Sequence, residues 1–109
     1  MRPGPDPVFA ALGDPTRRAV LALVGQRGPL TATELAERLP VSRQAVMKHL
    51  DLLRVAGLVD SEKQGRSVRY VLRSDPLEDA AAWMASVGAA WDRRLAALSQ
   101  RAAARKTPR

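Results

Sequence analysis

The segment after Ser42 separates hydrogen-bonding side chains from an apolar stripe. A helix over residues 42–56 that buries Val46, Leu50 and Leu53 turns a second set of side chains to solvent. This outward set is Arg43, Gln44, Met47, Lys48 and Asp51. A guanidinium can donate two hydrogen bonds to guanine O6 and N7, and a carboxamide can pair with adenine N6 and N7. Arg43 and Gln44 therefore predict a helix whose N-terminal turns contact base edges in a DNA major groove.

Three other residues of this helix have expected contacts, and for two of them an alternative remains open. Met47 cannot donate a hydrogen bond, so it either touches a thymine methyl group or packs against the preceding helix, and both remain open. Lys48 is expected at a phosphate. His49 is expected to be structural or to contact a phosphate, and a pH-dependent role is the less common alternative.

Hydroxyl side chains stand at two expected helix starts. Ser42 can cap the helix over residues 42–56 and donate to a phosphate. Thr31 and Glu34 have the spacing of a capping box, and Thr33 lies in the same first turn. Helix N-termini favour anions, so Thr31 and Thr33 are expected near the DNA backbone, with plain capping as the alternative.

A basic β-hairpin is expected next in the chain. Residues 58–63 and 68–73 are rich in strand-forming residues and flank a turn containing Gly65. The hairpin carries Lys63, Arg66, Arg69 and Arg73. We expect its tip to lie over the minor groove or its phosphates, and the alternative is a solvated charged hairpin.

Helices complete the arrangement around these residues. Short helices are predicted over 8–12, over 15–24 with Asp14 as cap, and over 31–39, and a long helix over 76–100. The order of four helices, a small β-hairpin and a last helix is that of a mainly α, winged helix-turn-helix fold. We expect a single domain over 1–109, with helices and wing in 6–73, the last helix in 75–100, and flexible ends at 1–5 and 101–109.

Two tryptophans mark one face of the last helix. Trp83 and Trp91 lie eight residues apart, and apolar residues at helical spacing continue the face as Val87, Leu95 and Leu98. Large aromatics at such spacing are usually core or interface residues. A small-molecule pocket between the tryptophans is a further alternative.

Composition excludes several classes of function. The chain has 109 residues, a net charge of +7, one histidine and no cysteine, which excludes disulfides, thiolate metal sites and a catalytic thiol. No glycine-rich phosphate loop or paired-carboxylate site is present, so we expect no enzyme and no cofactor. No apolar run is long enough to span a membrane and no secretory signal is recognised, so we expect a cytoplasmic protein. The basic charge favours a polyanionic partner.

Several motifs resemble the ArsR-type family of winged-helix regulators. They are Ala11–Val24 (ALGDPTRRAVLALV), Leu35–Leu39 (LAERL), Val41–Leu50 (VSRQAVMKHL), Leu53–Val59 (LRVAGLV) and the hairpin Gln64–Leu72. The resemblance covers about residues 8–100. It implies a homodimer that binds double-stranded DNA at a palindromic operator and usually represses. It also implies a dimer interface of the first and last helices, from Val8, Phe9, Leu12, Trp83, Val87, Trp91, Leu95 and Leu98.

The metal ligands of that family are missing here. The expected recognition helix has no cysteine, and the last helix has carboxylates but no imidazole. We therefore expect no metal site and a similarity to the branch whose last helix carries paired tryptophans, with any small-molecule ligand left open. The alternative function is a winged-helix protein-interaction module that does not read DNA sequence.

Overall fold

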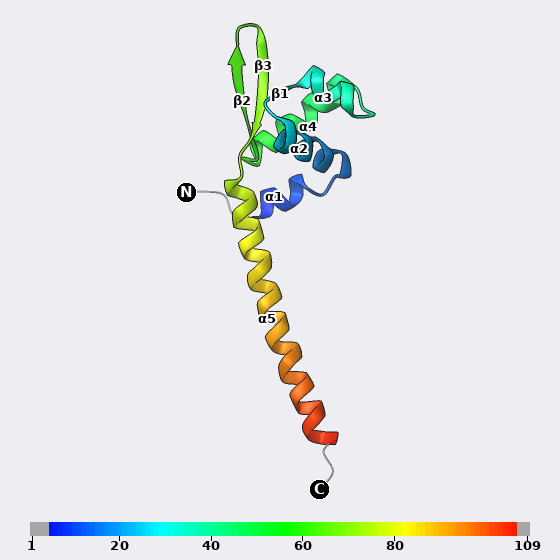
Figure 1. The fold of residues 1–109 in the computed structure, drawn as a ribbon, viewed down its shortest axis with the longest axis vertical. Coiled ribbons are helices and arrows are strands. Elements are labelled where there is room, and N and C mark those ends of the chain that lie inside the picture. Colours follow the sequence, from blue (N-terminus) through cyan, green and yellow to red (C-terminus); the bar gives the residue numbers. More distant parts are fainter. Residues whose placement is uncertain (1–4, 107–109) are drawn as a thin grey trace.

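The computed structural model describes residues 5–106, and side chains as far as residue 103. Its first helices are α1 (Asp6–Ala11) and α2 (Pro15–Arg27) (Figure 1). Asp14 caps α2 as expected, because its carboxylate accepts a hydrogen bond from the Arg17 N–H. The buried face of α2 consists of Val20, Leu21 and Val24.

The helix-turn-helix is formed by α3 (Ala32–Arg38) and α4 (Arg43–Val55). Thr31 and Glu34 form the predicted capping box at the start of α3, and the Ser42 hydroxyl accepts from the Ala45 N–H at the start of α4. The predicted stripe of Val46, Leu50 and Leu53 is fully buried. Because α4 is held by this stripe, its opposite face stays free for solvent or a ligand.

The sheet has one strand more than the sequence predicted. The hairpin of β2 (Val59–Gln64) and β3 (Ser67–Leu72) is present, with Gly65 at a φ of 60° in its turn. A short strand β1 (Leu30–Thr31) pairs antiparallel with β3, so the strand order is β1-β3-β2. This two-residue strand joins the start of α3 to the wing. The sequence did not predict it, because two residues are too few to show the alternation of a strand.

The last helix, α5 (Asp75–Lys106), is longer than expected. Its start agrees with the sequence to within a residue, but its end does not, because the helix continues past residue 100 to Lys106. Residues 1–4 and 107–109 lie outside the described part. At 1.5 Å per residue, the 32 residues of α5 span about 48 Å. Figure 1 shows α5 projecting away from the other elements, and near its start it packs against α1.

The core lies between the helices and one face of the sheet. Its largest fully buried side chains are Leu35, Leu50, Leu53 and Leu58. Val8 and Ala11 of α1 and Ala80 of α5 close it from the side of the last helix. No helix in the described part is both long enough and apolar enough to cross a membrane.

Candidate nucleic-acid interface

A cleft joins the start of α4 to the wing. It has a volume of about 380 Å³ and is lined by residues of β1, α3, α4 and β3 and by the hairpin turn. Five of the residues predicted to contact DNA line it: Thr31, Thr33, Arg43, Met47 and Arg66. These residues come from segments up to 35 positions apart in the sequence, so the fold gathers them on one concave surface.

Arg43 is held in place at the mouth of this cleft. Its Nε donates to the Thr33 hydroxyl at 3.2 Å, and both side chains are exposed. The bond leaves the terminal nitrogens of the guanidinium available for an acceptor outside the protein. Thr33 was predicted only as a phosphate or capping residue, and its role in orienting Arg43 was not foreseen because it depends on how α3 crosses α4.

Gln44 and Lys48 are exposed on the same helix. Met47 is half-buried, lines the cleft and also packs against the core. Its packing against the core agrees with the alternative of a contact within the protein, and its place in the cleft leaves contact with a thymine methyl group a prediction. The apolar surface it offers suits a methyl group better than a phosphate.

His49 does not face the cleft. It is half-buried, and its Nδ1 accepts a hydrogen bond from Arg17 Nε of α2 at 3.4 Å. A second nitrogen of Arg17, Nη1, donates to the Ala11 carbonyl at 3.2 Å. Of the two predicted roles, the contacts of His49 in the described part therefore match the structural one: it links α4 to α2 and the end of α1.

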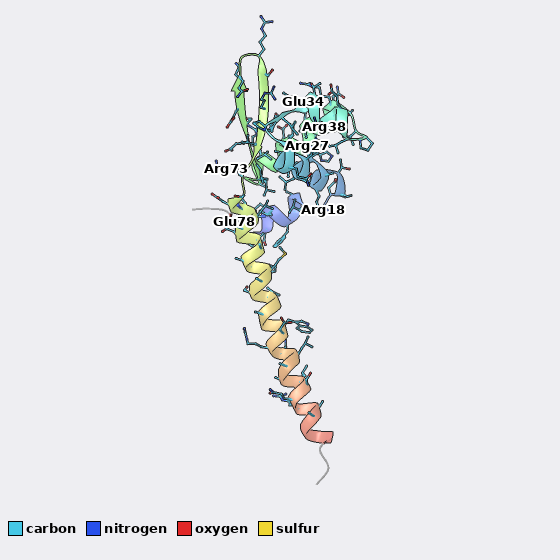
Figure 2. The ribbon with its side chains drawn as sticks, viewed as in Figure 1. Arg18, Arg27, Glu34, Arg38, Arg73 and Glu78 are labelled. Carbon is cyan, nitrogen blue, oxygen red and sulfur yellow. The ribbon has the colours of Figure 1, made fainter. Side chains whose placement is uncertain are left out.

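The four basic residues of the wing divide into two pairs. Lys63 and Arg66 are exposed near the tip. Arg69 instead donates to Glu34 at 3.1 Å, and Arg73 donates to Asp60 at 2.6 Å. Figure 2 shows Glu34 and Arg38 on α3, and Arg73 at the base of the wing near Glu78 of α5. The tip carries the basic charge that is free to meet DNA, whereas Arg69 and Arg73 also hold the wing in place.

Glu34 of α3 forms hydrogen bonds with residues of β1 and β3. Its Oε1 accepts both from the Thr31 N–H and from Arg69 Nη1 of β3. The hydrogen bonds to the Thr31 backbone and hydroxyl lower the pKa of Glu34, and the Arg69 charge adds to this effect. In the other ion pair of the wing, the hydrogen bond with Asp60 raises the pKa of Arg73. The ionised Glu34 carboxylate therefore contributes an ion pair between α3 and the wing.

The residues predicted for the dimer interface differ in how far they are buried. Val8 is only 2% exposed and belongs to the core of its own chain, so it has no free surface for a partner. Phe9 packs against Trp83 within the chain, with ring centroids 5.4 Å apart, and Leu12 is half-buried. The α5 residues Trp83, Val87, Trp91, Leu95 and Leu98 are all exposed, as is Met84.

Two exposed apolar residues were not singled out from the sequence. Leu52 and Val55 lie on the C-terminal half of α4, and Val55 is 81% exposed. The helical stripe of α4 already accounted for its buried residues, so the sequence offered no reason to assign Leu52 or Val55 a partner.

Comparisons with known proteins agree with this geometry. A helix-turn-helix domain family model matches residues 12–62. The uncharacterized HTH-type transcriptional regulator YuzN of Bacillus subtilis is 40% identical over 80 residues, covering 68% of this chain and 87% of YuzN. The transcriptional repressor SdpR of the same organism is 35% identical over 77 residues, covering 71% of this chain and 84% of SdpR.

Solved structures extend the similarity to the last helix. An ArsR-like transcriptional regulator from Rhodococcus sp. RHA1 has a TM-score of 0.79 and 48% identity, covering 90% of this chain and 92% of that one. An ArsR family regulator, RHA00566, has a TM-score of 0.70 and 36% identity, covering 84% and 97%. The chain therefore belongs to the ArsR family of winged helix-turn-helix, DNA-binding transcriptional regulators.

Proposed function

We propose that the chain acts as a homodimeric repressor that reads a palindromic operator through α4 and the tip of the wing. The observation that carries this proposal is the cleft between α4 and the wing, where a tethered Arg43, the half-buried Met47 and the exposed Arg66 share one surface. The name of the relative SdpR, a transcriptional repressor, supports repression as the outcome of binding.

The contacts divide by chemistry. Arg43 and Gln44 contact base edges, because they lie in the first turn of α4 and are exposed. Lys48, the Thr31 and Ser42 hydroxyls, and the wing residues Lys63 and Arg66 contact phosphates, which position the protein without specifying sequence. The two hydroxyl oxygens that accept capping bonds still carry a hydrogen that can be donated to a phosphate oxygen.

The apolar face of α5 supports dimerisation. Trp83, Val87 and Trp91 are each about half exposed along a helix that meets its own domain only near its start. An apolar strip of this length on an isolated helix is costly in water, and burying it against a second copy removes that cost. The two-fold symmetry of such a pair places two recognition helices on one DNA and makes the operator a palindrome.

We infer that thiolate chemistry does not supply the inducing signal. The sequence has no cysteine, and its one histidine is engaged by Arg17. No group of three or more metal-ligating side chains comes together within the described residues. We infer that DNA release, where it occurs, is driven by something other than a thiophilic metal.

Fluorescence anisotropy with the DNA upstream of the coding sequence tests the proposal. A scrambled duplex of equal length serves as control, and both are titrated at about 50 mM and about 200 mM salt. We expect affinity for both duplexes to fall steeply with salt, by ~10³-fold for about six phosphate contacts, while the preference for the native sequence persists. Equal binding to both duplexes, at both salt concentrations and with further genomic fragments, would contradict specific reading.

A further inference from the structure

A groove separate from the DNA cleft lies where α2, the base of the wing and the start of α5 meet. Its volume is about 420 Å³, which is within the range of small-molecule sites, ~300–1,000 Å³. The residues that line it are Leu12, Arg18, Leu21, Ala22, Gly25, Gln26, Leu72 and Leu77. Apart from Leu12, none of these residues takes part in the proposed contacts with DNA or with a second copy.

The walls of this groove are apolar. Leu21 of α2 is buried, whereas Leu72 of β3 and Leu77 of α5 are half-buried. A Cβ atom on Gly25 would come within 3.3 Å of Leu72 Cδ2, so α2 and β3 approach each other closely at this point. The half-buried leucines leave apolar surface in contact with water. A hydrocarbon ligand that covers this surface is stabilised by its removal from water.

Arg18 is the one charged side chain that lines the groove. Its Nη1 donates to the Leu12 carbonyl at 2.7 Å, which holds the guanidinium at that end of the groove. Among the described side chains, no carboxylate pairs with Arg18, and Asp75 and Glu78 of α5 are outside the lining. The other nitrogens of the guanidinium are therefore available to donate to an anion.

The position of this charge indicates the class of ligand. Arg18 and Gln26 are eight residues apart on α2, so they stand at opposite ends of a stretch about 12 Å long. One guanidinium at one end matches one carboxylate, and the leucines beside this stretch match a hydrocarbon chain. A metal ion requires ligands such as carboxylates or imidazoles, and the lining contains neither.

We propose that this groove binds a small amphipathic monocarboxylate, with its carboxylate on Arg18 and its hydrocarbon chain along Leu21, Leu72 and Leu77. Such a ligand touches the end of α1, the base of the wing and the start of α5 at the same time. These are the segments that join α5 to the body that contains α4. A bound ligand therefore favours one orientation of α5 relative to α4.

The ligand lowers the affinity for the operator, and this regulatory part rests on the proposed function. The carboxylate offsets part of the net charge of +7, which weakens the attraction to DNA phosphates. In the proposed homodimer, the orientation of α5 also sets the separation of the two α4 helices, and a ligand that holds another orientation opposes operator binding. By linkage, operator and ligand weaken the binding of each other by the same factor.

Amide NMR titration of the whole chain with octanoate tests the site. We expect saturable shifts at the amides of Ala22, Gly25 and Gln26, and none at the indole signals of Trp83 and Trp91. Octanol, which has the chain without the charge, and acetate, which has the charge without the chain, are the controls. Both should bind at least about tenfold more weakly than octanoate.

Three variants locate the contacts of the ligand. Arg18→Gln should raise the octanoate dissociation constant at least about fivefold, whereas Arg18→Lys, which keeps the charge, should recover most of the affinity. Arg27→Gln removes the same charge from an exposed residue of α2 outside the lining and should have no effect. Ala22→Trp changes an exposed residue of α2, fills the groove with an indole and should abolish octanoate binding.

Anisotropy with the upstream DNA tests the regulation. Octanoate should raise the operator dissociation constant at least about threefold in the wild type and in Arg27→Gln, relative to the same concentration of acetate. It should have little effect in Arg18→Gln. Without octanoate, Arg18→Gln and Arg27→Gln should bind the operator equally, because they have the same net charge.

The outcomes separate this inference from the proposed function. No saturable shift in the groove, or shifts confined to the tryptophans, overturns the ligand site and leaves the repressor in place. Shifts of Ala22 and Gly25 that follow protein concentration without octanoate show that a second copy covers the groove, which also overturns the site. Octanoate bound in the groove with unchanged operator affinity overturns the regulation. A chain that binds octanoate there but has no preference for its upstream DNA overturns the proposed function alone.

Discussion

Arg43 and Arg66 line the same cleft from different elements, and their surroundings predict different roles in DNA binding. Arg43 stands in the first turn of α4 and is oriented by the Thr33 hydroxyl. Arg66 stands at the tip of an exposed hairpin. A tethered guanidinium on a rigid helix can distinguish base edges, whereas a guanidinium on a loop is better suited to phosphates.

This difference predicts contrasting effects of two alanine variants. Arg43→Ala should lose discrimination at one operator position, by ~1–3 kcal/mol, because a base-edge contact is removed. Arg66→Ala should weaken binding to all sequences alike and reduce the salt slope by about 1. Anisotropy titrations against single-base operator variants measure both effects. A flat response of Arg43→Ala across that panel would show that the reading face has been misplaced.

Residue types and local spacing predicted the side chains that act within their own segment. The Asp14, Thr31 and Ser42 caps depend on neighbours three residues away, and all three are present. The environments of His49 and Arg69 could not be found in this way. Their hydrogen-bond partners, Arg17 and Glu34, are 32 and 35 residues distant in the chain, so only the packing of α2 and the wing against α3 and α4 reveals them.

At the scale of elements, one carboxylate of α3 adds an ion pair to the β1–β3 pairing that joins α3 to the wing. Glu34 closes the capping box of α3 and binds Arg69 of β3. The hydrogen bonds that Glu34 accepts from Thr31 lower its pKa from the ordinary value of 4.5, and the hydrogen bond from the Arg17 backbone lowers the pKa of Asp14. A carboxyl with a depressed folded-state pKa adds stability above its unfolded pKa, and that stability is lost as pH falls through the depressed value.

Glu34→Gln should therefore flatten the acid side of the stability profile. The amide can still accept the backbone hydrogen bond but does not titrate and does not pair ionically with Arg69. Urea denaturation from about pH 6 to about pH 3 should show a smaller loss of stability with acid than the wild type does. Glu37→Gln, an exposed change on the same helix, is the control. An unchanged slope for Glu34→Gln would show that the capping box and wing contact are not pH-linked.

The sequence predicted the helices and the hairpin, but it missed one strand and placed the end of α5 too early. The helix α4 and the hairpin have clear patterns and appear where expected. The strand β1 has two residues and exists only because β3 lies beside it. The end of α5 was placed too early because the apolar stripe stops at Leu98, while helical structure continues through an alanine-rich segment whose residues favour a helix without burial.

At the scale of the whole molecule, the described chain is an elongated body of 79 × 34 × 20 Å. The reading surface and the wing are at one end, and the exposed face of α5 occupies the other. In the proposed dimer, one end of each chain contacts DNA, and the other end sets the spacing and symmetry of the two copies. No single-chain pattern could predict that spacing, which depends on how α5 pairs.

Hydroxyl-radical footprinting of the native upstream DNA tests the central claim most directly. We predict two protected patches related by two-fold symmetry, with centres one or more whole DNA turns apart, each turn being ~34–36 Å. Trp91→Ala should weaken both patches together, because it removes an aromatic side chain that is 56% exposed on the proposed dimer face. A single protected patch, or two patches that persist unchanged in Trp91→Ala, would contradict a homodimer that reads a palindrome through α4.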